Sequence, residues 1–277
     1  MKKILVPTDF SPLAENALKV AAKIAKKHDG EIFLLHLLDL PVDLIDPTSA
    51  GDGNVLPESL FFMKLAHQRF TSAMKKDYLK GIKVHETVEF NEAFDGIMKV
   101  SQKHDCDLIV MGSHGSEGLK EVFVGSNTEK VVRYSDIPVL VIKNEAENFK
   151  AKSFLFATNL ALETTSSYLT AVKFAEKMGV KMKSVFINTV GKFRTSDHIE
   201  GQIEKFREAV NDKNLEIIVR NDKNMEDGIL NYAKKIDADL VGIGTHGRKG
   251  ISRLLNGSLS EHVVNHAKRP VITFKIK

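Results

Sequence analysis

Two stretches of the sequence, GSHGSEGLKEVFVGS at residues 112–126 and GTHGRKGISRLLNGS at residues 244–258, share one pattern of small residues. Small residues recur 132 residues later; among the pairs are Gly112 and Gly244, Gly115 and Gly247, Gly125 and Gly257, and Ser126 and Ser258. A pattern that repeats at one fixed distance indicates an internal duplication. The sequence therefore predicts two halves with the same plan.

The beginnings of the two halves are 150 residues apart, because ILVPTDF from Ile4 aligns with FLFATNL from Phe154. The first half is therefore longer than the second. We assign the additional residues to residues 39–59, which are rich in proline, glycine, aspartate and serine and lack helical or strand periodicity. This stretch is predicted to form an exposed, lid-like loop.

Composition limits the class of protein. The 277 residues suit two domains of roughly 100–150 residues each, and 43% hydrophobic residues are typical of globular chains. A net charge of +4 without a dense basic block argues against nucleic-acid binding, and no apolar run is long enough to favour a membrane span. The single cysteine, Cys106, suits a structural role in a reducing compartment, and Pro7 ends the N-terminal apolar run too early for a signal peptide. We expect a cytoplasmic location.

Strands and helices alternate in both halves. In the first half, apolar runs predict strands at residues 2–6, 31–38, 82–90, 108–112 and 139–143, and amphipathic periodicity predicts helices at residues 11–30, 60–81, 92–104 and 127–134. In the second half, strands are expected near Phe154, Val185, Ile217, Val241 and Ile272. Continuous apolar strands are typical of parallel sheets covered by helices on both faces. The prediction is two doubly wound, five-stranded α/β domains, residues 1–145 and 150–277.

The recurring glycines predict a phosphate site in each half. Ligands of open α/β sheets bind beyond the carboxyl ends of the strands, and glycine lets a ligand approach the backbone there. Gly125-Ser126 and Gly257-Ser258 precede the last helix of each half, where unpaired N–H groups favour an anion. The structural alternative is that Ser126 with Glu129, and Ser258 with Glu261, form capping boxes.

The G-x2-G-x9-G-[ST] spacing near the end of each half, together with the VPTDFS-like first strand, resembles the universal stress protein family in its tandem, two-domain form. This resemblance covers nearly the whole chain. It implies a Rossmann-like sheet order of 3-2-1-4-5 and a nucleotide, usually ATP, with or without Mg²⁺, at the motif. It also implies that the two domains pair through their last strands, PVLVIK and PVITFK, as an intrachain pseudo-dimer.

The resemblance places the nucleotide against residues of both halves. In the first half these are Pro7, Thr8, Asp9, Leu37, Met111, Gly112, Gly115, Gly125, Ser126 and Asn127. In the second half they are Ala157, Thr158, Asn159, Ile187, Ile243, Gly244, Gly247, Arg248, Gly257, Ser258 and Leu259. By the resemblance, the aspartate lies near the ribose and the base, and the glycines hold the phosphates.

The two predicted sites differ in charge. Asn159 replaces Asp9, which removes a carboxylate able to grip two hydroxyls. The second glycine loop carries Arg248, Lys249 and Arg253 and no acid, whereas acidic and basic residues are mixed in the first. We expect ATP in both halves, with better base and ribose contacts in the first and better triphosphate electrostatics in the second.

No motif predicts a dedicated catalytic activity. The chain lacks the Walker G-x4-G-K-[ST] sequence and the G-x-S-x-G elbow, and its ten histidines show no metal-ligand pattern around His114 and His246. The expected function is an ATP-binding stress-response regulator with at most slow hydrolysis. The alternative is a stress scaffold without nucleotide, and a nucleotide-activating transferase ranks last because no serine-glycine-glycine loop follows the first strand. The candidate partners are an adenine nucleotide, a second copy of the chain and an unidentified protein.

Overall fold

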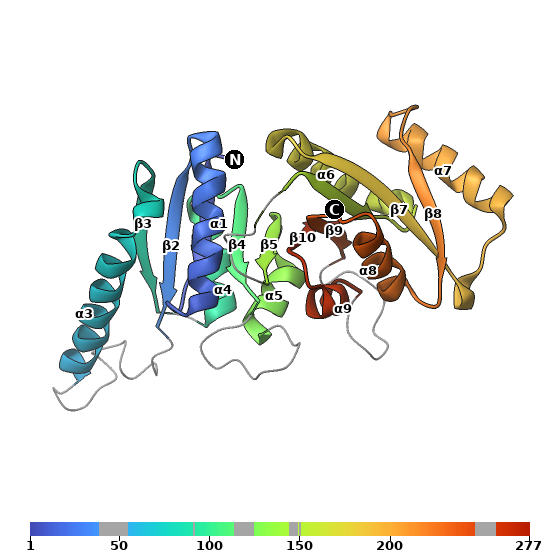
Figure 1. Cartoon of the computed structure of the whole chain (residues 1–277). Coiled ribbons are helices and arrows are strands. Elements are labelled where there is room, and N and C mark those ends of the chain that lie inside the picture. Colours follow the sequence, from blue (N-terminus) through green and yellow to red (C-terminus); the bar gives the residue numbers. More distant parts are fainter. Residues whose placement is uncertain (39–54, 91, 114–124, 144–148, 150, 247–258) are drawn as a thin grey trace. The chain divides into compact units, whose positions relative to one another are not determined.

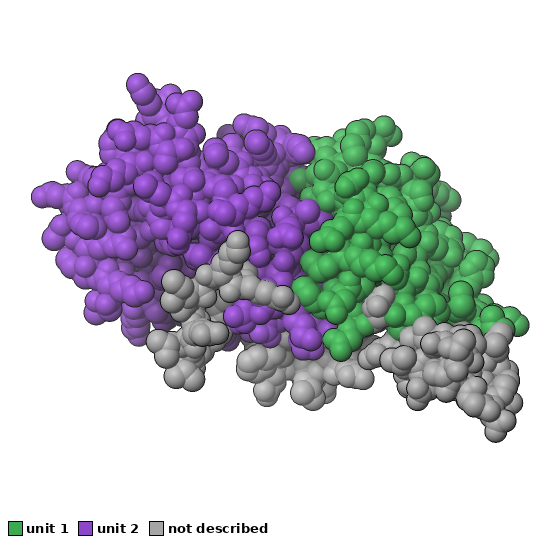
Figure 2. All heavy atoms as spheres, turned by 180° about the vertical axis from the view of Figure 1, so that it is seen from behind, with its two compact units in different colours: residues 1–119 green, residues 120–277 purple. Residues whose placement is uncertain are grey.

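The computed structural model describes the chain except for residues 39–54, 91, 114–124, 144–148, 150 and 247–258 (Figure 1). The chain divides into two compact units, residues 1–119 and 120–277 (Figure 2). The last helix and last strand of the first repeat therefore lie in the second unit. The domain limits 1–145 and 150–277 stay a prediction.

Unit 1 contains four parallel strands in the order β3-β2-β1-β4. The strands are β1 (Lys3–Pro7), β2 (Glu31–Leu37), β3 (Lys83–Glu89) and β4 (Leu108–Gly112). The helices are α1 (Pro12–His28), α3 (Val55–Met74) and α4 (Ala93–Lys103), with a short 3-10 turn at Asp77–Leu79. Strand β1 is buried along its middle residues and β4 along its whole length, as their apolar sequences require.

Helix α1 begins where its sequence predicts. Ser11 is the N-cap, its side chain accepts a hydrogen bond from the Ala14 amide, and Pro12 occupies the first turn. The helix ends at His28, and its C-cap residue Asp29 adopts the left-handed conformation. The predicted loop at residues 39–59 is too long, because Val55 already begins α3; residues 39–54 lie outside the described residues.

Unit 2 contains six strands in the order β5-β10-β9-β6-β7-β8. They are β5 (Val139–Ile142), β6 (Ser153–Ala157), β7 (Lys181–Thr189), β8 (Ile217–Asp222), β9 (Leu240–Thr245) and β10 (Val271–Lys275). The helices are α5 (Ser126–Tyr134), α6 (Thr165–Met178), α7 (Ser196–Val210), α8 (Met225–Lys235) and α9 (Leu259–His266). The second repeat, β8-β7-β6-β9-β10, confirms the predicted order 3-2-1-4-5.

The last strands of the two repeats pair with each other, as predicted. Strand β5 runs antiparallel to β10, and Leu140 lies opposite Ile272. These two residues are equivalent in the duplication, since they are 132 positions apart. The register is therefore two-fold symmetric, and each strand covers the edge that the other would expose.

Candidate functional site

The loop after β1 is held by its own polar side chains. The Thr8 hydroxyl accepts a hydrogen bond from the Phe10 amide at 2.9 Å, and Asp9 Oδ1 accepts one from the Ser11 amide at 2.9 Å. Phe10 has a φ of 64°, a conformation that is uncommon for a bulky residue. These bonds fix the turn at the carboxyl end of β1, where α1 begins.

The loop after β6 has the same construction. The Thr158 hydroxyl accepts a hydrogen bond from the Leu160 amide at 3.1 Å, and Asn159 Oδ1 accepts one from the Ala161 amide at 2.9 Å. Leu160 has a φ of 61°. Asn159 Oδ1 also lies 3.2 Å from the Thr164 hydroxyl, whose one proton it shares with the Ala161 carbonyl at 2.6 Å.

Both loops lie where the strand order reverses, between the first and the fourth strand of each repeat. In unit 1, β1 is the parallel neighbour of β4, so the Thr8–Asp9 turn and Gly112 follow adjacent strands. In unit 2, β6 is the parallel neighbour of β9, and Ala157 lies opposite Ile243. This switch point is where open α/β sheets bind their ligands.

The predicted apolar residues differ in accessibility. Pro7, Ala157 and Leu37 are half-buried at strand ends, and Asp9 and Asn159 are half-buried in the loops. Met111, Ile187 and Ile243 are buried, with 5%, 4% and 2% of their surfaces exposed. A Cβ at Gly228 of α8 would lie 2.5 Å from Ile187 Cγ2. Ile187 therefore packs against α8, and its predicted contact with a base stays a prediction.

Gly112 and Gly244 lie where a side chain would crowd neighbouring atoms. A Cβ at Gly112 would lie 3.1 Å from the backbone carbonyl of Leu13, and a Cβ at Gly244 would lie 2.9 Å from the Ser167 hydroxyl. Both residues lie within strands, and positive φ among the described glycines occurs at Gly81 and Gly179 instead. Both glycines therefore adopt strand conformations, and their contact with phosphates stays a prediction.

The start of α5 differs from the capping-box alternative. The N-cap is Gly125, so Ser126 is the first helical residue and cannot cap the helix with its side chain. Ser126 and Asn127 are exposed at this helix start, as an anion site requires. Glu129 hydrogen-bonds Glu261 across from α5 to α9, and burial, followed by the charge of Glu261, raises the pKa of Glu129.

The described residues do not include the centre of either glycine loop. Gly115, Gly247, Arg248, Gly257 and Ser258 lie outside them, as do His114, Lys249 and Arg253. Leu259 is the first residue of α9. The phosphate contacts of these residues stay a prediction.

The second switch point carries an ion pair that the sequence did not reveal. His246 Nε2, one residue beyond β9, lies 3.1 Å from Glu163 Oε1, and both side chains are exposed. Glu163 is 150 residues after Leu13, so the first half has no such carboxylate. The negative charge of Glu163 opposes anion binding at this edge, whereas the basic residues of the following loop favour it.

His36 is a second residue that sequence analysis missed. Its Nδ1 lies 2.8 Å from the Thr8 carbonyl, and burial lowers its pKa. In the neutral ring Nδ1–H donates to that carbonyl, which leaves Nε2 as an acceptor. The sequence offered one indication of this residue, because His36 directly precedes Leu37 at the end of the second strand.

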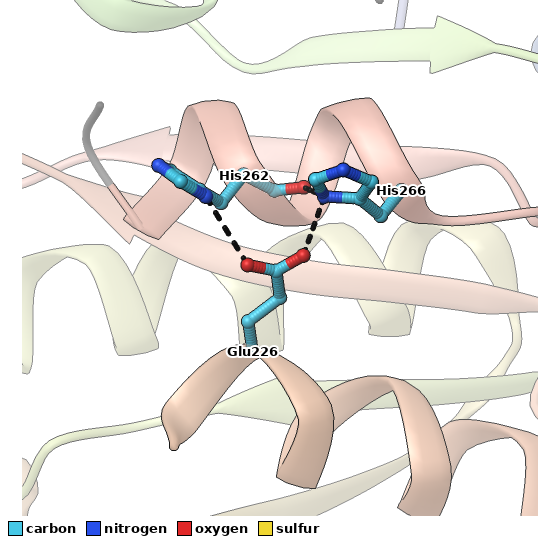
Figure 3. A group of neighbouring side chains, drawn as sticks. All are labelled: Glu226, His262 and His266. Carbon is cyan, nitrogen blue, oxygen red and sulfur yellow. Dashed lines mark hydrogen bonds and ion pairs between the residues drawn. The ribbon is translucent and has the colours of Figure 1, made fainter. Parts of the chain in front are cut away.

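A third group lies elsewhere in unit 2. Glu226 of α8 meets His262 and His266 of α9 (Figure 3). This differs from the expectation that the histidines form no ligand pattern. The spacing of the two histidines, four residues apart on one helix, was the available signal.

Comparisons with known proteins agree with this architecture. The profile of the universal stress protein family matches residues 1–143 and 151–275, so the chain belongs to this family. A universal stress protein of Synechocystis is 25% identical over 300 aligned residues, which cover 99% of this chain and 100% of the relative. One from Methanocaldococcus jannaschii is 33% identical over 52% of this chain and 96% of its own length.

A solved structure also matches the whole fold. The universal stress protein from Archaeoglobus fulgidus has a TM-score of 0.67 and 20% identity, with 99% of this chain and 98% of that chain covered. The relatives thus include proteins with one repeat and proteins with two. Within the described residues, no helix is both long enough and apolar enough to cross a membrane.

Proposed function

We propose that this chain is an ATP-binding regulator of the stress response, with a nucleotide at the switch point of each half. The observation that carries the proposal is the repeated loop geometry: Thr8-Asp9 and Thr158-Asn159 form the same hydrogen-bonded turn at equivalent strand ends. The turn fixes an Asp or Asn side chain at the edge where adjacent strands diverge. Preorganised polar groups at the switch point of an α/β sheet are typical of ligand sites.

The first half is proposed to hold the adenosine moiety more tightly. Asp9 Oδ1 accepts a hydrogen bond from the Ser11 amide, and its carboxylate carries a negative charge and a second acceptor oxygen that an asparagine lacks. Asn159 uses its single oxygen for the Ala161 amide and the Thr164 hydroxyl, so an NH₂ donor is what it offers a ligand. The two sites therefore differ in what they recognise, although their backbones agree.

Calorimetric titration with ATP tests this proposal, with Asp9→Asn as the key variant. Asparagine preserves the acceptor for the Ser11 amide, so the turn and the thermal midpoint should remain unchanged. Loss of the charge-assisted contacts is expected to weaken the tighter site about tenfold, the equivalent of roughly 1.4 kcal/mol. Absence of saturable ATP binding to the wild type would remove the proposal; equal affinity of Asp9→Asn and wild type would remove the role of Asp9.

Hydrolysis is proposed to be slow at most, because the sequence lacks a Walker lysine to hold the β- and γ-phosphates. The rate of phosphate release should stay far below about one turnover per second, which is the lower end of typical enzymatic rates. Turnover at ordinary enzymatic rates, removed by a substitution at Asp9, would contradict this assignment.

A scaffold without nucleotide is the second candidate, and one observation favours it. Gly112 and Gly244 are explained by close contacts with Leu13 and Ser167, so these glycines need no ligand. Native mass spectrometry of the purified chain separates the two candidates. Co-purified ATP or AMP supports the regulator. If the chain has the mass of the protein alone, both as purified and after incubation with ATP, the scaffold is supported.

A further inference from the structure

We propose that Glu226, His262 and His266 form a binding site for a late first-row divalent ion, with Zn²⁺ as the best match. The three residues each offer one ligand atom, and these atoms lie within 4.8 Å of one another (Figure 3). The site lies wholly within unit 2, and none of its three residues belongs to the proposed nucleotide sites. Two imidazoles and a carboxylate form the same ligand set as the open His₂Glu zinc sites of enzymes.

The two histidines are arranged by one helix. His262 and His266 lie four residues apart on α9, and residues with this spacing share one helix face. Their ring centroids are 6.3 Å apart. Paired histidines at this spacing are the two-point ligand of the H-E-x-x-H zinc motif. Helix α9 thus places both ligands on one face; His266 Nδ1 also lies 3.1 Å from the His262 carbonyl oxygen, a contact that a bound ion would replace.

The carboxylate comes from the neighbouring helix and reaches both rings. Glu226 Oε2 lies 3.2 Å from His262 Nδ1, and Glu226 Oε1 lies 2.5 Å from His266 Nδ1. Glu226 is in the first turn of α8, whose start is fixed by the Asn224 cap. The third ligand is therefore held in place by secondary structure as well.

The exposure of the group suits ion entry. The Glu226 side chain is 22% exposed, and those of His262 and His266 are 40% and 44% exposed. Three protein ligands leave a fourth position of a tetrahedral ion open to water. Imidazole ligands favour zinc, cobalt, nickel or copper over magnesium and calcium, which prefer oxygen.

The duplication supplies an internal comparison. The positions 132 residues earlier hold Phe94, Lys130 and Tyr134, so the first half carries none of the three ligands. The group is therefore not part of the shared repeat. A simple ion pair would need one histidine, whereas here both rings converge on the two oxygens of one carboxylate.

Cobalt titration of the metal-depleted full-length chain, without nucleotide, tests the proposal. Co²⁺ should give the visible absorption of a tetrahedral ion, saturating at one ion per chain, and Zn²⁺ should displace it. His262→Gln, His266→Gln and Glu226→Gln should each weaken binding at least tenfold. His198→Gln, at an exposed position on α7, is the matched control and should bind like the wild type.

Thermal unfolding gives a second measurement on the same proteins. Zn²⁺ should raise the midpoint of the wild type and of His198→Gln, and should leave that of His262→Gln/His266→Gln unchanged. The proposal is overturned if no saturable binding occurs, if the three ligand variants bind as tightly as His198→Gln, or if one ion is bound per two chains. Mg²⁺ in place of Zn²⁺ should produce none of these effects.

Discussion

The two halves of the chain differ in their cores and share the hydrogen bonding of the loops after their first strands. In the second half, Phe154, Phe174 and Phe274 contact one another with centroid distances of 5.9–6.3 Å. Their counterparts in the first half are Ile4, Ile24 and Ile142. The turns at Thr8-Asp9 and Thr158-Asn159 nevertheless keep the same hydrogen bonds. The core can change from aliphatic to aromatic because packing depends on total volume, whereas the turn depends on individual acceptor atoms.

Gly242 shows how the aromatic core was accommodated. A Cβ at this position would lie 2.5 Å from Cζ of Phe154, and the corresponding residue of the first half is Val110. The small residue on β9 thus compensates for the large residue on β6. The pair Val110 and Ile4 has become the pair Gly242 and Phe154.

The largest expected effect is that of Gly242→Val. The added methyl groups overlap the Phe154 ring, so the free energy of unfolding should fall by about 3 kcal/mol. Adding Phe154→Ile recreates the pair of the first half and should recover at least half of this loss. Urea unfolding of both variants measures the coupling; simple additivity of the two single effects would contradict the compensation.

Lys143, at the end of β5, extends the comparison to the paired edges. Its Nζ donates to the Asn265 carbonyl at 3.1 Å, and burial lowers its pKa to about 8. Because the folded-state pKa is below the unfolded one, the charged lysine destabilises the fold at neutral pH, and this cost disappears as the pH rises from about 8 to 10.5. Lys143→Met should be more stable than the wild type by about 1 kcal/mol at pH 7, with a smaller difference at pH 10.

The matched control for this measurement is Lys275→Met, the counterpart at the end of β10. Chemical unfolding at a series of pH values follows both variants. If the two substitutions change the free energy of unfolding with the same pH dependence, the effect is not specific to Lys143.

Glu129 and Glu261 are equivalent residues that face each other between α5 and α9. Arg133 Nη1 lies 3.4 Å from Glu261 Oε1, while burial and the neighbouring carboxylate raise the pKa of Glu129. A raised pKa means that the stabilisation by protonated Glu129 is present below its unfolded pKa and is lost as the pH rises through the folded value. Glu129→Gln should therefore stabilise the protein at pH 7 by about 1 kcal/mol, with no gain at pH 4. A pH-independent gain in thermal unfolding would point to packing instead.

The smallest expected effect concerns Glu163, which replaces Leu13 of the first half. Glu163→Gln removes a negative charge beside His246, at the edge proposed to bind phosphates. ATP affinity of the second site should rise roughly two- to fivefold, since exposed charges contribute about 0.2–1 kcal/mol. Calorimetry at low and high salt checks this, and an increase that persists at high salt would contradict the electrostatic cause.

Much of the fold was predictable because apolar periodicity reports burial directly. The second repeat has its strands near all five predicted residues, and Ser11 caps α1 as its sequence indicates. The absence of a capping box at Ser126 could not be predicted, because the sequence does not show that α5 begins one residue earlier, with Gly125 as its N-cap. The packing around Gly112 could not be predicted either, because it depends on the close approach of the Leu13 backbone.

The positions of the candidate sites could be predicted from the sequence, but the hydrogen bonding that distinguishes the two sites could not. Asp9 and Asn159 were identified at matching positions, and their one-letter difference suggested unequal sites. The sequence did not predict that Asn159 Oδ1 contacts the Ala161 amide and the Thr164 hydroxyl, because these contacts depend on the tertiary turn. Glu163 and Glu226 were missed because their histidine partners come from distant segments.

The symmetric register of β5 and β10, with Leu140 opposite Ile272, has an evolutionary consequence. In an assembly of two identical single-repeat chains, every substitution near the axis would occur on both sides at once. Covalent linkage of the repeats releases each side from that constraint. Arg133 beside Glu261, where the mirror position holds Asn265, is a contact that only a fused chain can acquire one side at a time.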